Sequence, residues 1–251
     1  MQVTFLGTGA ATAAPLYGCT CPACSLAQAQ PERRRGPASC LVQLGSEQFL
    51  IDAGMQDLKE RFAPGTLEDI LLTHYHMDHV QGLFGLRWGT NTKIRVTGPK
   101  DPNGCDDLFK HPGILDFSHT AEEYEGFKVG SVEVIPLTLN HSKPTVGYFC
   151  QSHRSTFAYL SDTSGLGSET YVFLRSVCPK VLVLDAAYPP QIERPRNHND
   201  LIGALEIFDV LKPEKLYLTH LDHGLDQWLL EHPDALPRGV EVAWDGMTIQ
   251  L

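Results

Sequence analysis

The stretch "LLTHYHMDHVQG", Leu71 to Gly82, places three histidines and one aspartate within six positions directly after a run of aliphatic residues. Side chains two apart in an extended segment point to the same side, so His74 and His76 can reach one metal ion together. Asp78 and His79 begin an apolar helical pattern and face another direction. Since neutral imidazole binds divalent cations, the stretch predicts the first half of a two-metal centre. The competing interpretation, unrelated surface histidines with Asp78 as a helix N-cap, requires a rare density of histidine after an aliphatic strand.

The sequence around this stretch alternates between two kinds of pattern. Short apolar segments rich in β-branched residues recur with turn residues between them, and we expect most of them to be strands. Helix-like patterns lie at residues 58–62, 79–87, 169–176, 200–211 and 226–231. This alternation predicts an α/β fold in which helices cover sheets. Without a Ser/Gly-rich linker or a repeat, residues 1–251 are expected to form one domain, with an irregular segment at about 98–126 that is typical of a lid or binding loop.

Several of the predicted strands end in a potential metal ligand. Ligands are expected where a strand continues into a loop, because the sheet fixes the backbone while the loop leaves the side chain accessible. The positions with this character are Asp52, His74, Asp162, Asp185 and His220.

Composition restricts the class of partner. The formal net charge of −10 argues against broad electrostatic binding of nucleic acid, which depends on many Lys and Arg side chains. No stretch approaches the roughly 18 to 20 apolar residues of a membrane span. The segment "MQVTFLGTGA" has neither a basic region nor a long apolar region, so we expect a cytoplasmic protein without a membrane partner.

A cysteine cluster, "YGCTCPAC", predicts a second kind of metal site. The seven cysteines and the expected compartment favour reduced thiols or metal ligands over disulfides. Cys19, Cys21 and Cys24 have a spacing that suits one tetrahedral zinc ion, with His223 as the best candidate for the fourth ligand. Such a site would anchor the loop that carries His220. A redox pair, buried reduced thiols, or a fourth ligand from the other cysteines, Cys40 or Cys105, are the alternatives.

The segment "THYHMDH" fits the His-x-His-x-Asp-His signature, and on it the chain resembles the metallo-β-lactamase superfamily. The resemblance implies an α/β (α+β) fold of the αββα sandwich type with a binuclear metal site at one sheet edge. It assigns one ion to His74, His76 and His141, and the other to Asp78, His79 and His220. Asp162 would bridge the two ions.

Further motifs narrow the resemblance to the PhnP family of phosphoribosyl cyclic phosphate phosphodiesterases: "GCTCPAC", "RWG", "GCDDLFKHPG", "NHSK" and "PRNHNDL". This resemblance implies hydrolysis of 5-phospho-α-D-ribosyl 1,2-cyclic phosphate to ribose 1,5-bisphosphate in phosphonate catabolism, the carbon–phosphorus lyase pathway. It also implies two divalent ions in the active site, manganese or else zinc, one structural zinc, and a homodimer. The catalytic residues would be Asp78 and His198, the latter as general acid. Asp200 could orient His198, but we favour it as the cap of the following helix.

A substrate with a second phosphate needs local positive charge, because guanidinium and ammonium groups suit phosphate oxygens. Lys143 and Arg196 are the hypothesised contacts, among the candidates Arg87, Lys110, Lys143, Arg194 and Arg196. Solvated surface charge is an equally good interpretation of any single one.

Other functions stay open. The same metal set would serve another cyclic phosphodiester, such as a 2′,3′-cyclic nucleotide, or a thioester, lactone or lactam. A tRNA 3′-processing nuclease shares the motif, but the acidic charge argues against it. A zinc-stabilised interaction protein without turnover is the alternative from a different class.

Overall fold

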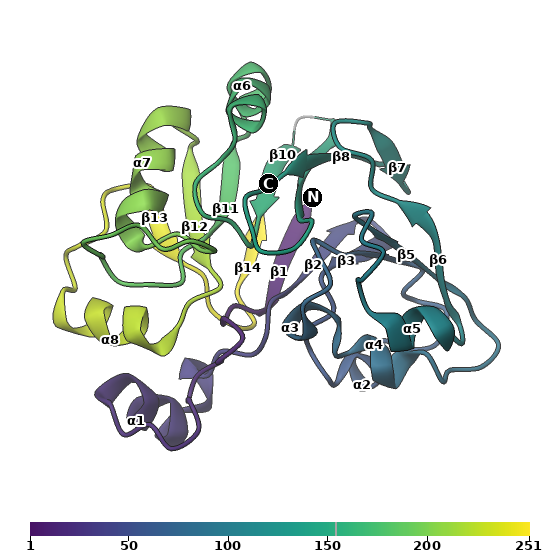
Figure 1. Cartoon of the computed structure of the whole chain (residues 1–251), viewed down its shortest axis with the longest axis horizontal. Helices are drawn as coiled ribbons and strands as arrows, with labels where there is room; N and C mark the ends of the chain where they lie inside the picture. The colour runs from purple at the N-terminus through teal and green to yellow at the C-terminus, as the bar shows by residue number, and fades with distance from the viewer. Residues whose placement is uncertain (154) are drawn as a thin grey trace.

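Two seven-stranded sheets form the centre of the computed structural model, which describes residues 1–153 and 155–251 (Figure 1). The first sheet has the order β14 (Thr248–Gln250), β1 (Gln2–Gly7), β2 (Ser39–Leu44), β3 (Glu47–Ile51), β4 (Asp69–Leu71), β5 (Ile94–Gly98) and β6 (Leu115–Thr120). The second has the order β13 (Val240–Val242), β12 (Lys215–Thr219), β11 (Val181–Asp185), β10 (Ser155–Leu160), β9 (Val146–Ser152), β8 (Val132–Thr138) and β7 (Phe127–Val129). Both sheets mix parallel and antiparallel pairs.

Helices cover the outer side of each sheet. On one side lie α2 (Leu58–Arg61), α3 (Met77–Val80), α4 (Leu83–Leu86) and α5 (Asp106–Lys110), and on the other α6 (Ser168–Val177), α7 (Leu201–Leu211) and α8 (His223–Glu231) (Figure 1). A separate segment contains α1 (Pro22–Ala29) and the 3-10 helix η1 (Pro31–Arg33). The predicted αββα fold of the α+β type is therefore confirmed.

Strand residues alternate between two cores. In β10, Phe157 and Tyr159 join the cluster between the sheets, whereas Ala158 and Leu160 join the cluster beneath α6, α7 and α8. A third cluster lies beneath the helices of the first sheet. Because both faces of the central strands are buried, their sequences are nearly continuous apolar runs.

The expectation of an irregular segment at about 98–126 is wrong in part, since these residues include α5 and β6. The helix α5 is supported by an ion pair of Asp106 with Lys110 at 2.8 Å, and β6 pairs in parallel with β5. The helical pattern at 79–87 is two short helices, α3 and α4, and α1 was not predicted. Whether residues 1–251 are one domain stays a prediction. Among the described residues, no helix is both long and apolar enough to cross a membrane.

Candidate metal centres and active site

The first cluster brings three imidazole nitrogens to one point. His76 Nδ1 lies 2.9 Å from His74 Nε2 and 3.1 Å from His141 Nε2. The Nδ1 atom of His141 contacts the carbonyl oxygen of Asn197 at 2.9 Å and donates to it, so the neutral ring has no proton on Nε2. His76 Nδ1 can donate a hydrogen bond to only one of its two neighbours, so hydrogen bonds among the three rings cannot satisfy all three nitrogen atoms. A cation placed between these nitrogens would accept a lone pair from each of them.

The second cluster is built around two carboxylates. His79 Nε2 lies 3.4 Å from Asp78 Oδ2 and 3.3 Å from Asp162 Oδ2, and it is buried without a hydrogen-bond partner. His220 Nε2 lies 3.4 Å from Asp78 Oδ2 and 3.3 Å from Asp162 Oδ1. Asp162 Oδ2 also faces the first cluster, 3.7 Å from His74 Nε2. Asp162 is therefore common to both groups of candidate ligands.

Burial and charge prepare these groups for a divalent cation. Burial, together with the charge of His79, holds the pKa of His74 well below its ordinary value, so the ring is neutral. Burial would raise the pKa of Asp162, but the charges of His220 and His79 hold it well below the usual range. A neutral imidazole such as His74 and an ionised carboxylate such as Asp162 are donors that divalent metals take in hydrolytic sites, and a metal ion would supply the positive charge that a protonated His79 provides without it.

Asp52 supports the second cluster from behind. Its Oδ2 lies 2.8 Å from His79 Nδ1, and its Oδ1 accepts the backbone N–H of Thr73 at 2.8 Å. The sequence marked Asp52 as a possible ligand, but the structure places it behind His79, which fixes that ring and its tautomer. Asp52 and His220 both have left-handed backbones, with φ of 62° and 59°, and each directly follows a strand, β3 and β12 respectively.

His198 lies beside the metal clusters and is held by a buried carboxylate. Its Nδ1 contacts Asp185 Oδ2 at 2.9 Å, and its ring stacks on His220 with centroids 4.9 Å apart. Burial would lower the pKa of His198, but the hydrogen bond and charge of Asp185 raise it to about 9. The prediction that Asp200 caps a helix is confirmed, since its Oδ1 accepts the Gly203 N–H at 2.8 Å. The carboxylate that orients His198 is thus Asp185, which sequence reasoning had marked only as a strand-end residue.

An open cavity of about 350 Å³ gives access to this site. Its wall contains members of both metal clusters, His198 and other residues: Ala10, Ala11, Thr12, His76, Met77, Asp78, His141, Ser142, Asp162, Ala187, Tyr188, Asn197, His198, His220 and Asp222. The arrangement can therefore admit a small substrate to the metals and to His198 at once.

The structure does not bring the hypothesised phosphate contacts into this cavity. Among the described residues that line it, none is Lys or Arg. Lys143 Nζ lies 3.5 Å from Asp101 Oδ2, and Arg196 is not a lining residue. The other candidates pair with carboxylates of residues that do not line the cavity: Arg87 with Asp107, Lys110 with Asp106, and Arg194 with Glu206.

The cysteine cluster forms a separate group at the start of α1 and α8. His223 Nδ1 lies 3.7 Å from Cys19 Sγ and 3.6 Å from Cys21 Sγ, and Cys24 completes the set. A tetrahedral zinc ion bound at ordinary distances would place sulfur and nitrogen about 3.6 Å apart. Of the two alternative fourth ligands, Cys40 is fully buried in the core between the sheets, and Cys105 is not a member of this group. The residues present therefore fit a closed zinc site that includes His223.

The sequence of the chain is similar to those of a known family and of several known proteins. A family model described as a beta-lactamase superfamily domain matches residues 47–221. A protein named octanoyltransferase from Porphyromonas gingivalis is 26% identical, over 98% of this chain and 51% of its own length. Ribonuclease Z from Methanosarcina mazei is 24% identical over 59% of this chain and 47% of its own length. The chain thus spans about half the length of the curated relatives it matches.

Two solved structures overlay the whole chain. A structure described as a new diphosphatase from the PhnP family has a TM-score of 0.83 and 25% identity, and the match covers 99% of this chain and 96% of that one. Zinc-bound PqqB from Methylobacterium extorquens has a TM-score of 0.79 at 20% identity and full coverage of both chains, which shows a shared fold.

Proposed function

The chain belongs to the metallo-β-lactamase superfamily, and from that premise we propose that it is a metal-dependent phosphodiesterase. The observation that carries this proposal is the shared carboxylate of Asp162, which lies between two groups of candidate ligands that open onto one cavity. One ion would be held by His74, His76, His141 and Asp162, and the other by Asp78, His79, Asp162 and His220. Two divalent ions held this way activate water and stabilise the charge that develops on phosphoryl oxygens.

His198 is the general acid in this proposal. Asp185 holds Nδ1, so Nε2 is the atom left to give a proton to the departing oxygen. The ring lies beside candidate ligands from both clusters, with centroid distances of 4.9 Å to His220 and 5.1 Å to His141. A phosphate bound between the clusters would therefore have its leaving group near this histidine.

We propose 5-phospho-α-D-ribosyl 1,2-cyclic phosphate as the substrate, with ribose 1,5-bisphosphate as the product. Water adds to phosphorus, the bond from phosphorus to the sugar O2 breaks, and the proton goes to O2. The likeness to a PhnP-family structure over nearly the whole of both chains supports this choice. Manganese in the active site, with zinc as the alternative, zinc in the cysteine cluster, and a homodimer belong to the same proposal.

A second candidate substrate is a nucleoside 2′,3′-cyclic phosphate. It is favoured by the cavity lining, in which the described residues include no Lys or Arg that would neutralise a second phosphate. The ribonuclease Z relatives raise RNA as a further candidate partner. We expect no tight RNA complex, given the net charge of −10, and gel shifts across a salt series test this.

Phosphorus NMR of the cyclic sugar phosphate with manganese-loaded protein tests the proposed function. Conversion to ribose 1,5-bisphosphate establishes both the substrate and the bond that breaks. If the signal of the cyclic sugar phosphate is unchanged while 2′,3′-cyclic AMP is hydrolysed rapidly, the protein is a phosphodiesterase with a different substrate. Inactivity toward both esters and an aryl phosphodiester, in protein shown to contain its metals, refutes the phosphodiesterase.

A further inference from the structure

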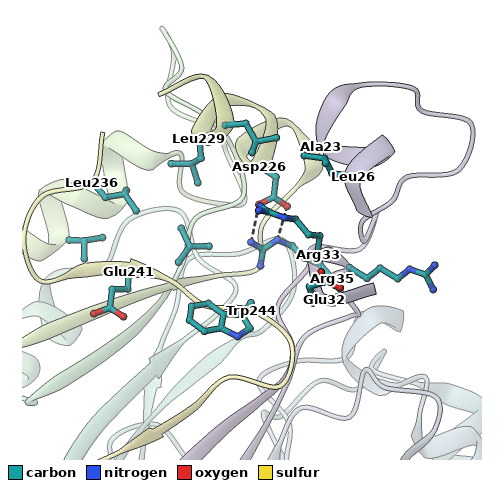
Figure 2. Close-up of a pocket in the computed structure, with 14 residues that line it drawn as sticks. Ala23, Leu26, Glu32, Arg33, Arg35, Asp226, Leu229, Leu236, Glu241 and Trp244 are labelled. Carbon is teal, nitrogen blue, oxygen red and sulfur yellow. Dashed lines mark hydrogen bonds and ion pairs between the residues drawn. The ribbon is translucent and has the colours of Figure 1, made fainter. Parts of the chain in front are cut away.

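A groove of about 690 Å³ lies away from the histidine-aspartate clusters, between α8, the α1–η1 segment and strand β13. Figure 2 shows Leu229 and Leu236 on one side of it, Ala23 and Leu26 on another, and the Trp244 ring beneath. Trp244 is 51% exposed, and Leu230, which also lines the groove, is 40% exposed. Apolar side chains left in water along a groove of this size are typical of a binding surface.

The groove borders a sheet edge with unused peptide groups. Strand β13 is the outermost strand of the second sheet and runs parallel to β12. Leu216 donates its N–H to Gly239 O at 2.8 Å, and Ala243 donates to Leu218 O at 2.9 Å. In a parallel ladder alternate residues bond to the neighbouring strand, so Val240 and Val242 turn their peptide groups outward. The Val240 N–H already donates to Pro237 O at 3.1 Å, which leaves the Val240 C=O and both groups of Val242 at the edge. Among the described residues, neither the N–H nor the C=O of Val242 has a hydrogen-bond partner.

Three consecutive residues of β13, Val240, Glu241 and Val242, line the groove. Since side chains alternate across a strand, a cavity on one face alone would meet every second residue. The groove therefore runs along the edge itself. A purely apolar ligand there would remove the outward peptide groups from water without replacing their hydrogen bonds, whereas an added strand would bond to them.

The charges around the groove select the partner. Asp226 is paired with Arg35 at 2.6 Å, and Glu241 is paired with Lys215. Once these pairs cancel, the charged lining residues that remain are Arg33 and Arg34 against Glu32. The groove thus has a locally basic rim in a chain of net charge −10.

We propose that this groove binds an extended peptide segment by strand addition to β13. The partner segment has apolar residues at alternate positions, which enter the groove, and acidic residues at the end beside Arg33 and Arg34. This site is separate from the histidine-aspartate clusters and from the proposed hydrolysis, and its walls α1 and α8 begin at the cysteine cluster.

The test uses labelled synthetic peptides of about six residues, the usual length of a strand, and fluorescence anisotropy with the metal-loaded protein. An array of peptides with alternating valine, leucine or threonine is made in three forms: with two aspartates at one end, with two lysines there, and with N-methyl groups on alternate amides. Binding of the aspartate form is expected to exceed that of the other two by about tenfold, which corresponds to about 1.4 kcal/mol.

Variants at one position separate backbone pairing from apolar contact. Val242→Pro removes an outward N–H but no hydrogen bond to β12, so the fold and the hydrolase activity are retained while peptide binding is lost. Val242→Ala, the matched control, keeps that N–H and retains most of the binding. Arg33→Gln with Arg34→Gln removes the preference for aspartate over lysine.

Several results would overturn the proposal that the groove binds a peptide, and some of them would identify a different occupant. The proposal is overturned if no peptide of the array binds, if N-methylated peptides bind equally well, or if Val242→Pro has no more effect than Val242→Ala. Displacement of the label by dodecanoate but not by unlabelled peptide would assign the groove to lipids. Concentration-dependent self-association that Val242→Pro abolishes, seen by sedimentation, would assign it to a second copy of this chain.

Discussion

The two groups of candidate metal ligands differ in donors, in chain separation and in access. The cysteine cluster takes three of its four members from positions 19–24 and uses only sulfur and imidazole. The histidine-aspartate clusters take ligands from positions 74 to 220, share the carboxylate of Asp162, and open onto a cavity of about 350 Å³. A closed set of soft donors suits an ion that holds structure, whereas carboxylates beside an open space suit ions that act on a substrate.

A short connection joins the two regions. His220 directly follows β12, and His223 begins α8 three residues later. Between them, Leu221 donates its N–H to Thr8 O at 2.9 Å, and Asp222 caps α8 by accepting the Gly224 N–H at 2.7 Å. Damage to the cysteine cluster is therefore expected to reach the active site through His220, but less directly than removal of a ligand there.

The largest effect is expected from His76→Ala, which removes one of three converging nitrogens. Diester hydrolysis should fall by about 10³-fold or more, equivalent to at least about 4 kcal/mol of transition-state stabilisation. Since His76 is only partly buried, the melting temperature should change little. Steady-state kinetics measure the activity and thermal unfolding measures the melting temperature. His119→Ala, which changes an exposed residue of β6, is the control. Full activity in His76→Ala would remove this histidine from the metal site.

Cys21→Ser is expected to show the opposite pattern, with stability lost before activity. Zinc content should fall, and the melting temperature should drop by on the order of 10 °C, because a structural metal contributes folding free energy. Cys21 is also the N-cap of α1, and its Sγ accepts the Cys24 N–H at 3.4 Å. Serine is a good N-cap, so the substitution tests the metal rather than the cap.

Exposed Cys178→Ser is the matched control for Cys21→Ser. Elemental analysis and calorimetry of the two variants give the comparison. If Cys21→Ser kept its zinc and its melting temperature but lost activity, the division between a structural and a catalytic region would be wrong.

His198→Ala is expected to have an intermediate effect that depends on the leaving group. For a sugar leaving group, kcat should fall by about 10²- to 10⁴-fold, the usual contribution of a general acid. For a nitrophenyl diester, whose leaving group needs no proton, the loss should be much smaller. Kinetics with both substrates measure the ratio, and exposed His111→Ala serves as the control. Equal losses on both substrates would assign His198 a role in binding rather than proton transfer.

The sequence predicted the parts of the site that depend on local spacing. His74, His76, Asp78 and His79 follow one strand within six positions, so their proximity needs no knowledge of the fold. Asp162 and His220 were marked as potential ligands at strand ends, but their grouping with His141 and with the first four residues came from the family resemblance, because nothing local links them. The same distinction holds for the fold, in which apolar strands were recognisable but α5, with its Pro- and Gly-rich flanks, was not.

The partners of charged groups are determined only by the tertiary structure. Asp200 is two residues from His198, yet the partner of that ring is Asp185, the end of a different strand. Lys143 was expected at a phosphate, but the buried carboxylate of Asp101 lies 3.5 Å from its amine. Sequence gives the type of each charged group, whereas the nearest opposite charge depends on how the loops meet.

The smallest effect is expected from Asp52→Asn, which acts behind the ligands. The side chain is fully buried, and Asn preserves its size while it removes the charge that holds His79 Nδ1–H. Metal affinity should fall by about 10- to 100-fold, the usual cost of losing such a partner, and activity should recover when metal is added in excess. Competition with a chelator measures the affinity, and Asp57→Asn, at the partly exposed N-cap position of α2, is the control. If excess metal restores the activity of Asp52→Asn but not that of His76→Ala, Asp52 supports a ligand and is not itself a ligand. If excess metal does not restore the activity of Asp52→Asn, Asp52 is instead essential to the fold of the site.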